Sequence, residues 1–213
     1  MKYHIFFLLA ILFTSISLSQ DFGIKIGATR SEIIVTDKKN PPYGPIENDL
    51  GPAFNPSICI FTNVITSQLL DIKANLNYIQ IGSSKTQNMS YLSWNDDPSL
   101  PPKHADYTSV VDMQYLQLSI SFQPKLYLGN TIVYLSIDPS VSYVTKISNL
   151  LLTEGKTSFI FGAAGGVGVN IATVAGKNIF GEVKYYRDLT SFYKTPYEKF
   201  WNSYFIITFG TTL

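Results

Sequence analysis

The residues of this sequence that could activate a water molecule for hydrolysis gather between residues 85 and 110. Asp96, Asp97, His104 and Asp106 all fall there, and carboxylate and imidazole groups can act as general bases. Catalysis needs such groups in a fixed geometry, whereas this segment is polar and carries three prolines. The four residues also lack the regular oxygen-ligand spacing of a calcium loop. We therefore interpret them as part of a solvated surface loop and predict no catalytic residue and no metal site.

Two other features could suggest chemistry. Cys59 is the only cysteine, which excludes a disulfide framework and a cysteine-based zinc site, so we interpret it as a small buried side chain. The glycine-rich stretch Gly162–Gly168 lacks the Gly-Lys-Ser/Thr ending of a Walker loop and the GxGxxG pattern of a dinucleotide fold. The sequence therefore predicts no cofactor and no enzymatic activity.

The composition bounds the kind of surface that the chain presents. Of 213 residues, 46% are hydrophobic and 15% are charged, against about 25% charged residues in an ordinary globular domain. Sixteen Lys and Arg against fifteen Asp and Glu leave a net charge of +1, which argues against a nucleic-acid partner. Such a composition excludes a disordered chain and suggests a surface that does not face water everywhere.

The first residues indicate export. Lys2 precedes an unbroken apolar run from Ile5 to Phe13, and Ser17-Leu18-Ser19 supplies the small residues that a signal peptidase reads. A transmembrane helix needs about 20 apolar residues, and this run turns polar at Thr14. We predict a signal peptide at residues 1–19 and one mature domain at residues 20–213.

The mature chain alternates between apolar and polar residues, as two-faced β-strands do. In Val133–Val144, for example, Val133, Leu135 and Ile137 alternate with Tyr134, Ser136 and Asp138. We predict eight strands: Gly23–Val35, Ala53–Thr62, Leu69–Ser84, Val111–Leu128, Thr131–Lys146, Ser158–Ile171, Asn178–Ser191 and Asn202–Leu213. Pro56, Pro124 and Pro139 fall inside these spans, where bulges or strand ends are expected.

One stretch allows a different interpretation. Thr157–Gly176 contains no charge and has Gly162 and Gly166 at the GxxxG spacing of packed transmembrane helices. Its five glycines dilute the hydrophobicity, and Asn170 interrupts it. We therefore favour a strand here.

Short and long connections alternate between the predicted strands. The short ones are 63–68, 129–130 and 172–177, and the long ones are 36–52, 85–110, 147–157 and 192–201. This parity is typical of closed up-and-down barrels of the outer membrane, with short periplasmic turns and long extracellular loops. We predict an all-β fold, a closed antiparallel eight-stranded transmembrane β-barrel.

The alternative is a soluble barrel like a lipocalin, which would put the apolar rows inside and bind a small hydrophobic ligand there. The polar rows are rich in Ser, Asn, Gln and Thr, and their charges are of both signs, which favours an enclosed polar lumen. We predict that Lys73, Asp138, Glu182 and Lys184 form a lumen network. Six aromatic residues near strand ends suit membrane-interface girdles: Phe22, Tyr78, Tyr134, Tyr143, Phe192 and Trp201.

The sequence also resembles a known family. The segments that carry the resemblance are Gly23–Ala28, Leu70–Tyr78, Tyr115–Leu118, Tyr134–Tyr143, Phe161–Gly168 and Phe180–Tyr186. In this order they are similar to the outer membrane protein beta-barrel domain of the PorT-like type, a family of small eight-stranded barrels. The resemblance implies a signal peptide, a closing C-terminal strand and, for PorT itself, a link with type IX protein secretion. This chain ends on Leu213, where the family usually ends on an aromatic residue.

An eight-stranded barrel has an interior that side chains fill, so a wide diffusion pore is not expected. We predict a monomeric, non-catalytic scaffold or interaction protein of the outer membrane, with the lipid bilayer and an unidentified protein as partners. Ser84–Tyr91 and Tyr107–Asp112 should continue the third and fourth strands as a hairpin, with an irregular tip near Trp94–Pro102. Tyr91 and Trp94 are the candidate contact residues at its end.

Overall fold

The structure of the chain is a computed structural model, which describes residues 22–37, 51–91, 103–147, 157–172, 178–194 and 198–213. The predicted signal peptide lies outside these residues. Eight long strands and one short one make up the described fold: β1 (Phe22–Asp37), β2 (Gly51–Thr66), β3 (Leu70–Tyr91), β4 (Lys103–Leu128), β5 (Thr131–Ile147), β6 (Phe159–Ala172), β7 (Asn178–Asp188), β8 (Tyr193–Lys194) and β9 (Glu198–Thr212).

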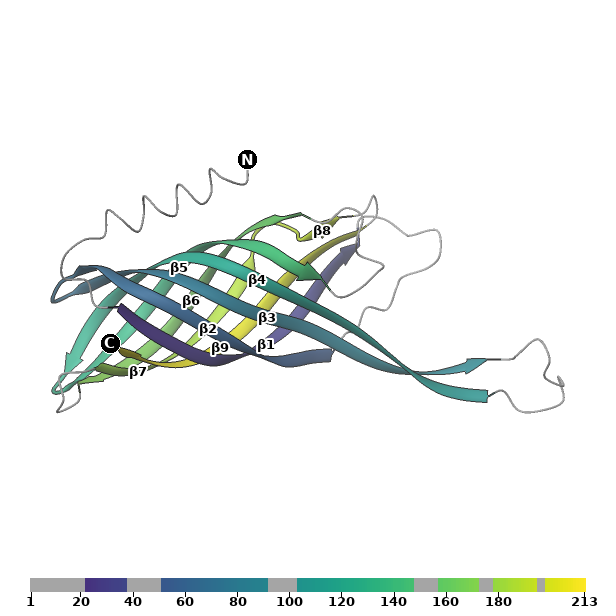
Figure 1. Cartoon of the computed structure of the whole chain (residues 1–213), viewed down its shortest axis with the longest axis horizontal. Coiled ribbons are helices and arrows are strands. Elements are labelled where there is room, and N and C mark those ends of the chain that lie inside the picture. The colour runs from purple at the N-terminus through teal and green to yellow at the C-terminus, as the bar shows by residue number, and fades with distance from the viewer. Residues whose placement is uncertain (1–21, 38–50, 92–102, 148–156, 173–177, 195–197) are drawn as a thin grey trace.

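The long strands form one closed antiparallel barrel (Figure 1). Each pairs with the next along the chain, β7 pairs with β9, and β9 returns to pair with β1 from Gly23–Thr212 to Asp37–Glu198. The short β8 adds only two residues beside β9. The closed eight-stranded up-and-down barrel predicted from the sequence is therefore confirmed. Closure leaves no open sheet edge along the barrel wall, as a chain crossing lipid requires.

Alternate residues of every long strand point to opposite sides of the barrel wall. On β5, Ile137 is 61% exposed, whereas the next residue, Asp138, is completely buried. The buried rows are mostly polar: among others, Ser57, Asn75, Asn77, Gln117, Ser119, Ser121 and Ser136 face inward. A lipocalin-like barrel has the reverse arrangement, so the soluble alternative is not favoured.

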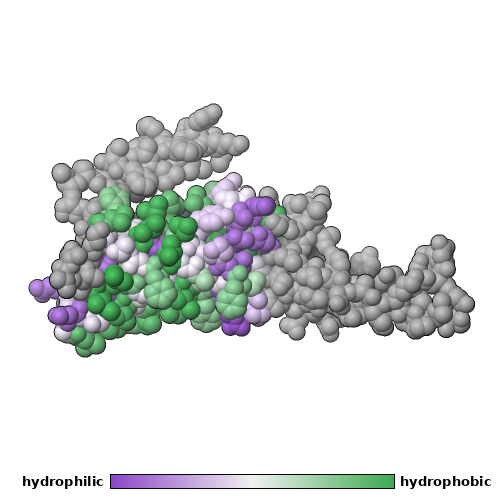
Figure 2. All heavy atoms as spheres, turned by 60° about the horizontal axis from the view of Figure 1, so that its bottom comes forward, coloured by the Kyte–Doolittle hydropathy of each residue, from purple (hydrophilic) through white to green (hydrophobic). Residues whose placement is uncertain are grey.

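The exposed rows form an apolar belt around the barrel. Its members include Ile24, Ile26, Ile58, Ile60, Leu118, Ile120, Leu135, Ile137, Val167, Val169, Val183, Ile207 and Phe209. On the face seen in Figure 2, hydrophobic residues form a broad band, and hydrophilic residues gather at both of its ends. Such an exposed surface far exceeds the few hundred Å² of apolar patch that soluble monomers tolerate, and it fits the hydrocarbon layer of a bilayer.

The predicted aromatic girdles need correction. Phe22 is exposed at the start of β1 and Tyr143 is exposed near the end of β5, as expected. Tyr78 is exposed but lies within β3, at the end of its apolar row, and Trp201 is half-buried. Tyr134 and Phe192, however, are buried. Tyr134 follows the inward row of β5, and Phe192 belongs to the apolar cluster that fills one end of the lumen. Aromatic residues near strand ends thus occur on both sides of the wall, and within a strand their parity decides the side.

Strands β3 and β4 run past the rim of the barrel as a two-stranded hairpin (Figure 1). They stay paired from Ser84–Val110 to Tyr91–Lys103, whereas β2 pairs with β3 only as far as Ser84 and β5 pairs with β4 only as far as Met113. The predicted continuation of both strands is therefore confirmed, and β4 begins earlier than predicted. The predicted irregular tip at residues 94–102 lies outside the described residues.

Local chemistry explains the remaining details of the strands. Gly129 has φ of 64° in the turn between β4 and β5, a conformation that glycine adopts without steric cost. Pro56 lies where the register between β2 and β3 shifts, as expected of a residue with no backbone donor. The glycine-rich segment forms strand β6, as predicted. Among the described residues, no helix is long and apolar enough to span a membrane.

Candidate functional site

The structure places the four predicted network residues in the lumen of the barrel. Lys73 comes from β3, Asp138 from β5, and Glu182 and Lys184 from β7, and each side chain is almost fully buried. Lys184 contacts both acids: its Nζ lies 2.8 Å from Asp138 Oδ2 and 3.2 Å from Glu182 Oε2. Glu182 and Lys184 are two residues apart on β7, so the strand alternation points them to the same side.

Glu182 is the centre of this network and contacts residues from four other strands of the barrel. The Lys25 ammonium of β1 lies 2.9 Å from Glu182 Oε2. Gln123 Nε2 and Tyr134 OH donate hydrogen bonds to Glu182 Oε1, at 3.1 and 2.8 Å. Thr208 of β9 donates to Oε2 at 3.4 Å. One buried carboxylate thus joins β1, β4, β5, β7 and β9, which satisfies the hydrogen-bonding needs of a charge held away from water.

Lys25 is the network residue that the sequence analysis missed. It stands between Ile24 and Ile26, and this alternation already puts it on the row opposite to the apolar one. A lone lysine between apolar residues and glycines gave no sign of which acid it would meet, because that acid lies 157 residues away along the chain.

Lys73 lies in the same layer but contacts rings rather than an acid. Among the described residues it makes no ion pair, and its Nζ lies 5.1 Å from the Phe61 ring, 5.6 Å from Tyr134 and 5.2 Å from Phe180. Lys25 shares two of these rings, at 5.0 Å from Phe61 and 5.5 Å from Phe180. Attraction between a cation and the ring faces compensates part of the lost hydration of each ammonium.

Further along the axis the lumen is filled by amides, hydroxyls and then apolar side chains. Gln117 Nε2 donates to Ser142 Oγ and Tyr204 OH, both at 3.1 Å, and Asn75 Nδ2 donates to Ser121 Oγ at 2.9 Å. Beyond them, Asn202 Nδ2 donates to Asp188 Oδ2 at 3.0 Å and to Tyr115 OH at 2.6 Å. An apolar cluster follows, which includes Ile33, Ile79, Ile81, Met113, Val144, Ile160, Phe192 and Tyr193. Side chains therefore occupy the space that a diffusion pore would need.

The remaining residues that the sequence singled out are Cys59, the acids and histidine between residues 85 and 110, and the candidate contact residues. Cys59 is buried, and its Sγ lies 3.9 Å from Asn75 Oδ1, consistent with a packed thiol. Within the described ranges, no three His, Cys, Asp or Glu residues gather as a metal ion would need. Asp96, Asp97 and Trp94 lie outside the described residues. Tyr91 ends β3, and neither its side chain nor those of His104 and Asp106 is described, so the contact role of Tyr91 and Trp94 stays a prediction.

Comparisons with known proteins find remote similarity only. No family model and no curated protein matches the sequence, so the PorT-like resemblance stays a prediction. Among solved structures, Neisserial surface protein A (NspA) is similar over 92% of this chain and 100% of that chain, at 12% identity and a TM-score of 0.45. Ail of Yersinia pestis gives 11% identity and a TM-score of 0.36, over 91% of this chain and 99% of that chain. The β domain of the Bordetella autotransporter BrkA gives 9% identity and a TM-score of 0.31, over 90% of this chain and 99% of that chain.

The architecture is instead established by the pairing and burial of this chain's own strands. The wall is closed, its outer rows are apolar, and its inner rows are polar and hydrogen-bonded. This is the architecture with which single chains cross the outer membrane, and it agrees with the outer-membrane location predicted from the sequence.

Proposed function

We propose that the chain is a non-catalytic integral protein of the outer membrane that presents the β3–β4 hairpin to a protein partner outside the cell. The observation that carries this proposal is the relation between belt and hairpin. The apolar rows end near Tyr78 and Leu116, whereas β3 and β4 remain paired as far as Tyr91 and Lys103. The hairpin therefore projects well beyond the surface that fits the hydrocarbon layer (Figure 1).

The hairpin has the properties of a docking element. Beyond Ser84 and Met113 its outer edges pair with no neighbouring strand among the described residues, so backbone donors and acceptors remain for a partner. An extended segment of another protein could add a strand to such an edge. Of the candidate contact residues, Tyr91 ends β3, and Trp94 follows three residues later in the sequence. A partner in a secretion apparatus is what the PorT-like resemblance implies, and an adhesion partner would use the same surface.

The filled lumen favours a scaffold over a channel. The buried ion pairs and the apolar cluster fill the interior of the barrel, so contacts with a partner would be made by its outside. We propose that the barrel acts as a monomer, because every strand of the closed wall pairs on both sides with strands of the same chain.

Protease treatment of intact cells tests the topology. Trypsin should cut near Lys103 in intact cells, and the barrel strands should resist it. Protection in intact cells, with cleavage only after the outer membrane is opened, would place the hairpin in the periplasm and contradict the proposed outside partner. A photoreactive side chain is then placed at position 94 and, as a control, at the exposed Asn130 in the opposite turn, to determine whether cross-linking to a protein depends on the hairpin.

A further inference from the structure

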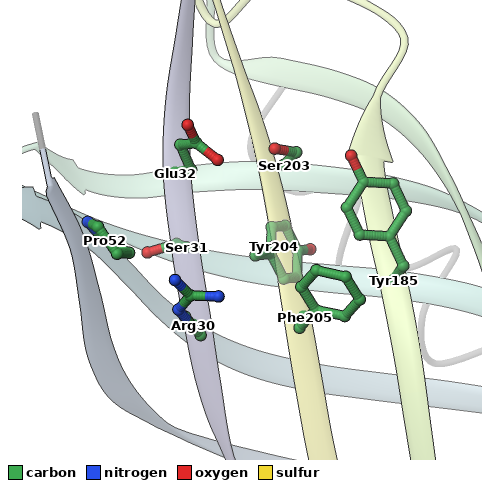
Figure 3. A pocket seen from close by; sticks show the side chains of 8 residues that line it. All are labelled: Arg30, Ser31, Glu32, Pro52, Tyr185, Ser203, Tyr204 and Phe205. Carbon is green, nitrogen blue, oxygen red and sulfur yellow. The ribbon is translucent and has the colours of Figure 1, made fainter. Parts of the chain in front are cut away.

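The outer wall carries a groove at the edge of the apolar belt. It has a volume of about 350 Å³, and its lining includes Arg30, Glu32 and Pro52 together with Tyr185, Ser203 and Phe205. Figure 3 shows Arg30 and Glu32 one above the other on β1, with Phe205 of β9 and Tyr185 of β7 beside them. The groove thus lies over the seam where β9 closes the barrel against β1.

The position of these residues along β1 places the groove at the membrane surface. The outward row of β1 runs Ile24, Ile26, Ala28, Arg30 and Glu32, so the apolar belt ends at Ala28 and charge begins at the next outward position. β1 continues from there to Asp37, on the side of the hairpin (Figure 1). Arg30 is therefore level with the headgroup layer on the hairpin side of the bilayer, and Glu32 lies farther from the hydrocarbon layer.

The neighbouring strands line the groove with aromatic side chains beside Arg30 and with a small side chain beside Glu32. Arg30 pairs with Phe205, and Phe205 pairs with Tyr185, whose ring lies 4.9 Å from that of Phe205 between centroids. Glu32 pairs with Ser203, whose small side chain leaves room above it. Exposed tyrosine and phenylalanine at this depth suit the boundary between acyl chains and headgroups.

Both charges are available to a ligand. Among the described residues, neither Arg30 nor Glu32 takes part in an ion pair, and both side chains are exposed. They are two residues apart, so about 7 Å separates them along the strand. Guanidinium binds phosphate oxygens in a bidentate manner, and a carboxylate accepts hydrogen bonds from an ammonium group.

We propose that this groove binds the phosphoethanolamine headgroup of a lipid. The phosphate would contact Arg30 at the end of the belt, the terminal ammonium would reach Glu32 farther out, and the acyl chains would lie along Phe205 and Tyr185. The order of charge matches this headgroup, because its phosphate lies nearer the acyl chains than its ammonium does. Choline offers Glu32 no N–H donor, so the Glu32 carboxylate would favour ethanolamine over choline.

The inference rests on the proposed membrane location, and the test is designed to separate the two. The full-length mature barrel is reconstituted in lipid vesicles, its resistance to alkaline extraction is recorded, and it is transferred to mild detergent. Lipid retained per barrel is then measured by native mass spectrometry during titration with phosphatidylethanolamine, phosphatidylcholine or phosphatidylglycerol. Three variants are compared: Arg30→Gln, Glu32→Gln and the control Lys146→Gln, which removes an exposed cation on β5 outside the groove.

The wild type should retain phosphatidylethanolamine about tenfold more tightly than phosphatidylcholine, as expected for a hydrogen bond to a charged group. Arg30→Gln should weaken binding of all three lipids, Glu32→Gln should abolish only the preference for ethanolamine, and Lys146→Gln should change neither. If the barrel inserts but the Arg30 and Glu32 variants retain lipid as tightly as the wild type, the proposed headgroup site is wrong. Equal competition by free phosphoethanolamine would also overturn it, in favour of a soluble ligand. Failure to insert would overturn the membrane function itself.

Discussion

Lys25 on the first strand and Glu182 on the seventh form an ion pair of 2.9 Å across the seam that closes the barrel. The strand between them, β9, pairs with both β1 and β7, and its Thr208 donates to the same carboxylate. The pair therefore links the two ends of the sheet from inside, in addition to the backbone ladder. Both groups are buried, so the attraction between them must compensate the hydration that each has lost.

Removing the Glu182 carboxylate should destabilise the barrel strongly. In Glu182→Ala, Lys25 loses its only ion pair among the described residues, while Lys184 keeps Asp138. Leaving a buried charge unpaired typically costs about 3–5 kcal/mol, so the free energy of unfolding should fall by about that amount. Urea unfolding in detergent micelles measures it, with Asp97→Ala in the predicted surface loop as the control. Equal and small losses in the two variants would show that the network does not stabilise the fold.

Two glycines on the same strand should respond oppositely to alanine. A Cβ at Gly168 would meet the Tyr134 ring, whereas a Cβ at Gly165 would meet nothing within 4 Å. Gly168→Ala should displace Tyr134 from its 2.8 Å hydrogen bond to Glu182 and destabilise the barrel by about 1–3 kcal/mol, as overpacking does. Gly165→Ala should be neutral or stabilise by about 0.5–1 kcal/mol, because glycine loses more entropy on folding.

The same unfolding assay checks this pair of variants. A Gly168→Ala barrel as stable as the wild type would mean that Tyr134 does not fill the space facing β6. The Tyr134→Phe variant separates steric from polar effects, since it keeps the ring and removes only the hydroxyl that contacts Glu182.

A cation on the outer wall should be costly only within the belt. Ile137 is 61% exposed near the middle of β5, and Thr145 is exposed near its end. In a bilayer, Ile137→Arg should cost about 2–4 kcal/mol and Thr145→Arg about 0–1 kcal/mol, because the penalty follows depth. Folding into lipid vesicles at graded urea concentrations measures both. In a water-exposed wall, Ile137→Arg would be neutral, and that result would exclude a lipid-facing belt.

The sequence predicts those features of this structure that depend on neighbouring residues, and not those that depend on residues far apart in the chain. Alternation is local, so Asp138, Glu182 and Lys184 could be assigned to the inner rows from their neighbours alone. The contacts among them are not local, because the tilt and stagger of the strands decide which residues meet across the lumen. Lys73 illustrates this limit: its inward direction was evident, but its three aromatic neighbours come from β2, β5 and β7.

Other differences have the same cause. Tyr134 was assigned to a girdle from its proximity to a strand end, whereas its parity along β5 decides the face that it occupies. Phe192 lies between β7 and β8, where no strand alternation indicates its direction. The buried Asp188, Asn202 and Tyr115 cluster was not predicted, because its members lie 14 and 87 residues apart in the chain. The hairpin beyond Ser84 was predictable, since the polar segments on both sides of the tip retain residues such as Thr, Tyr, Val and Met.

The most direct test of the membrane barrel is the partition of the mature protein after expression of the full chain in a Gram-negative cell. The protein should sediment with the outer membrane, resist alkaline extraction and enter solution only with detergent, because its apolar rows face outward. Recovery as a monodisperse monomer in the soluble fraction without detergent would contradict the account.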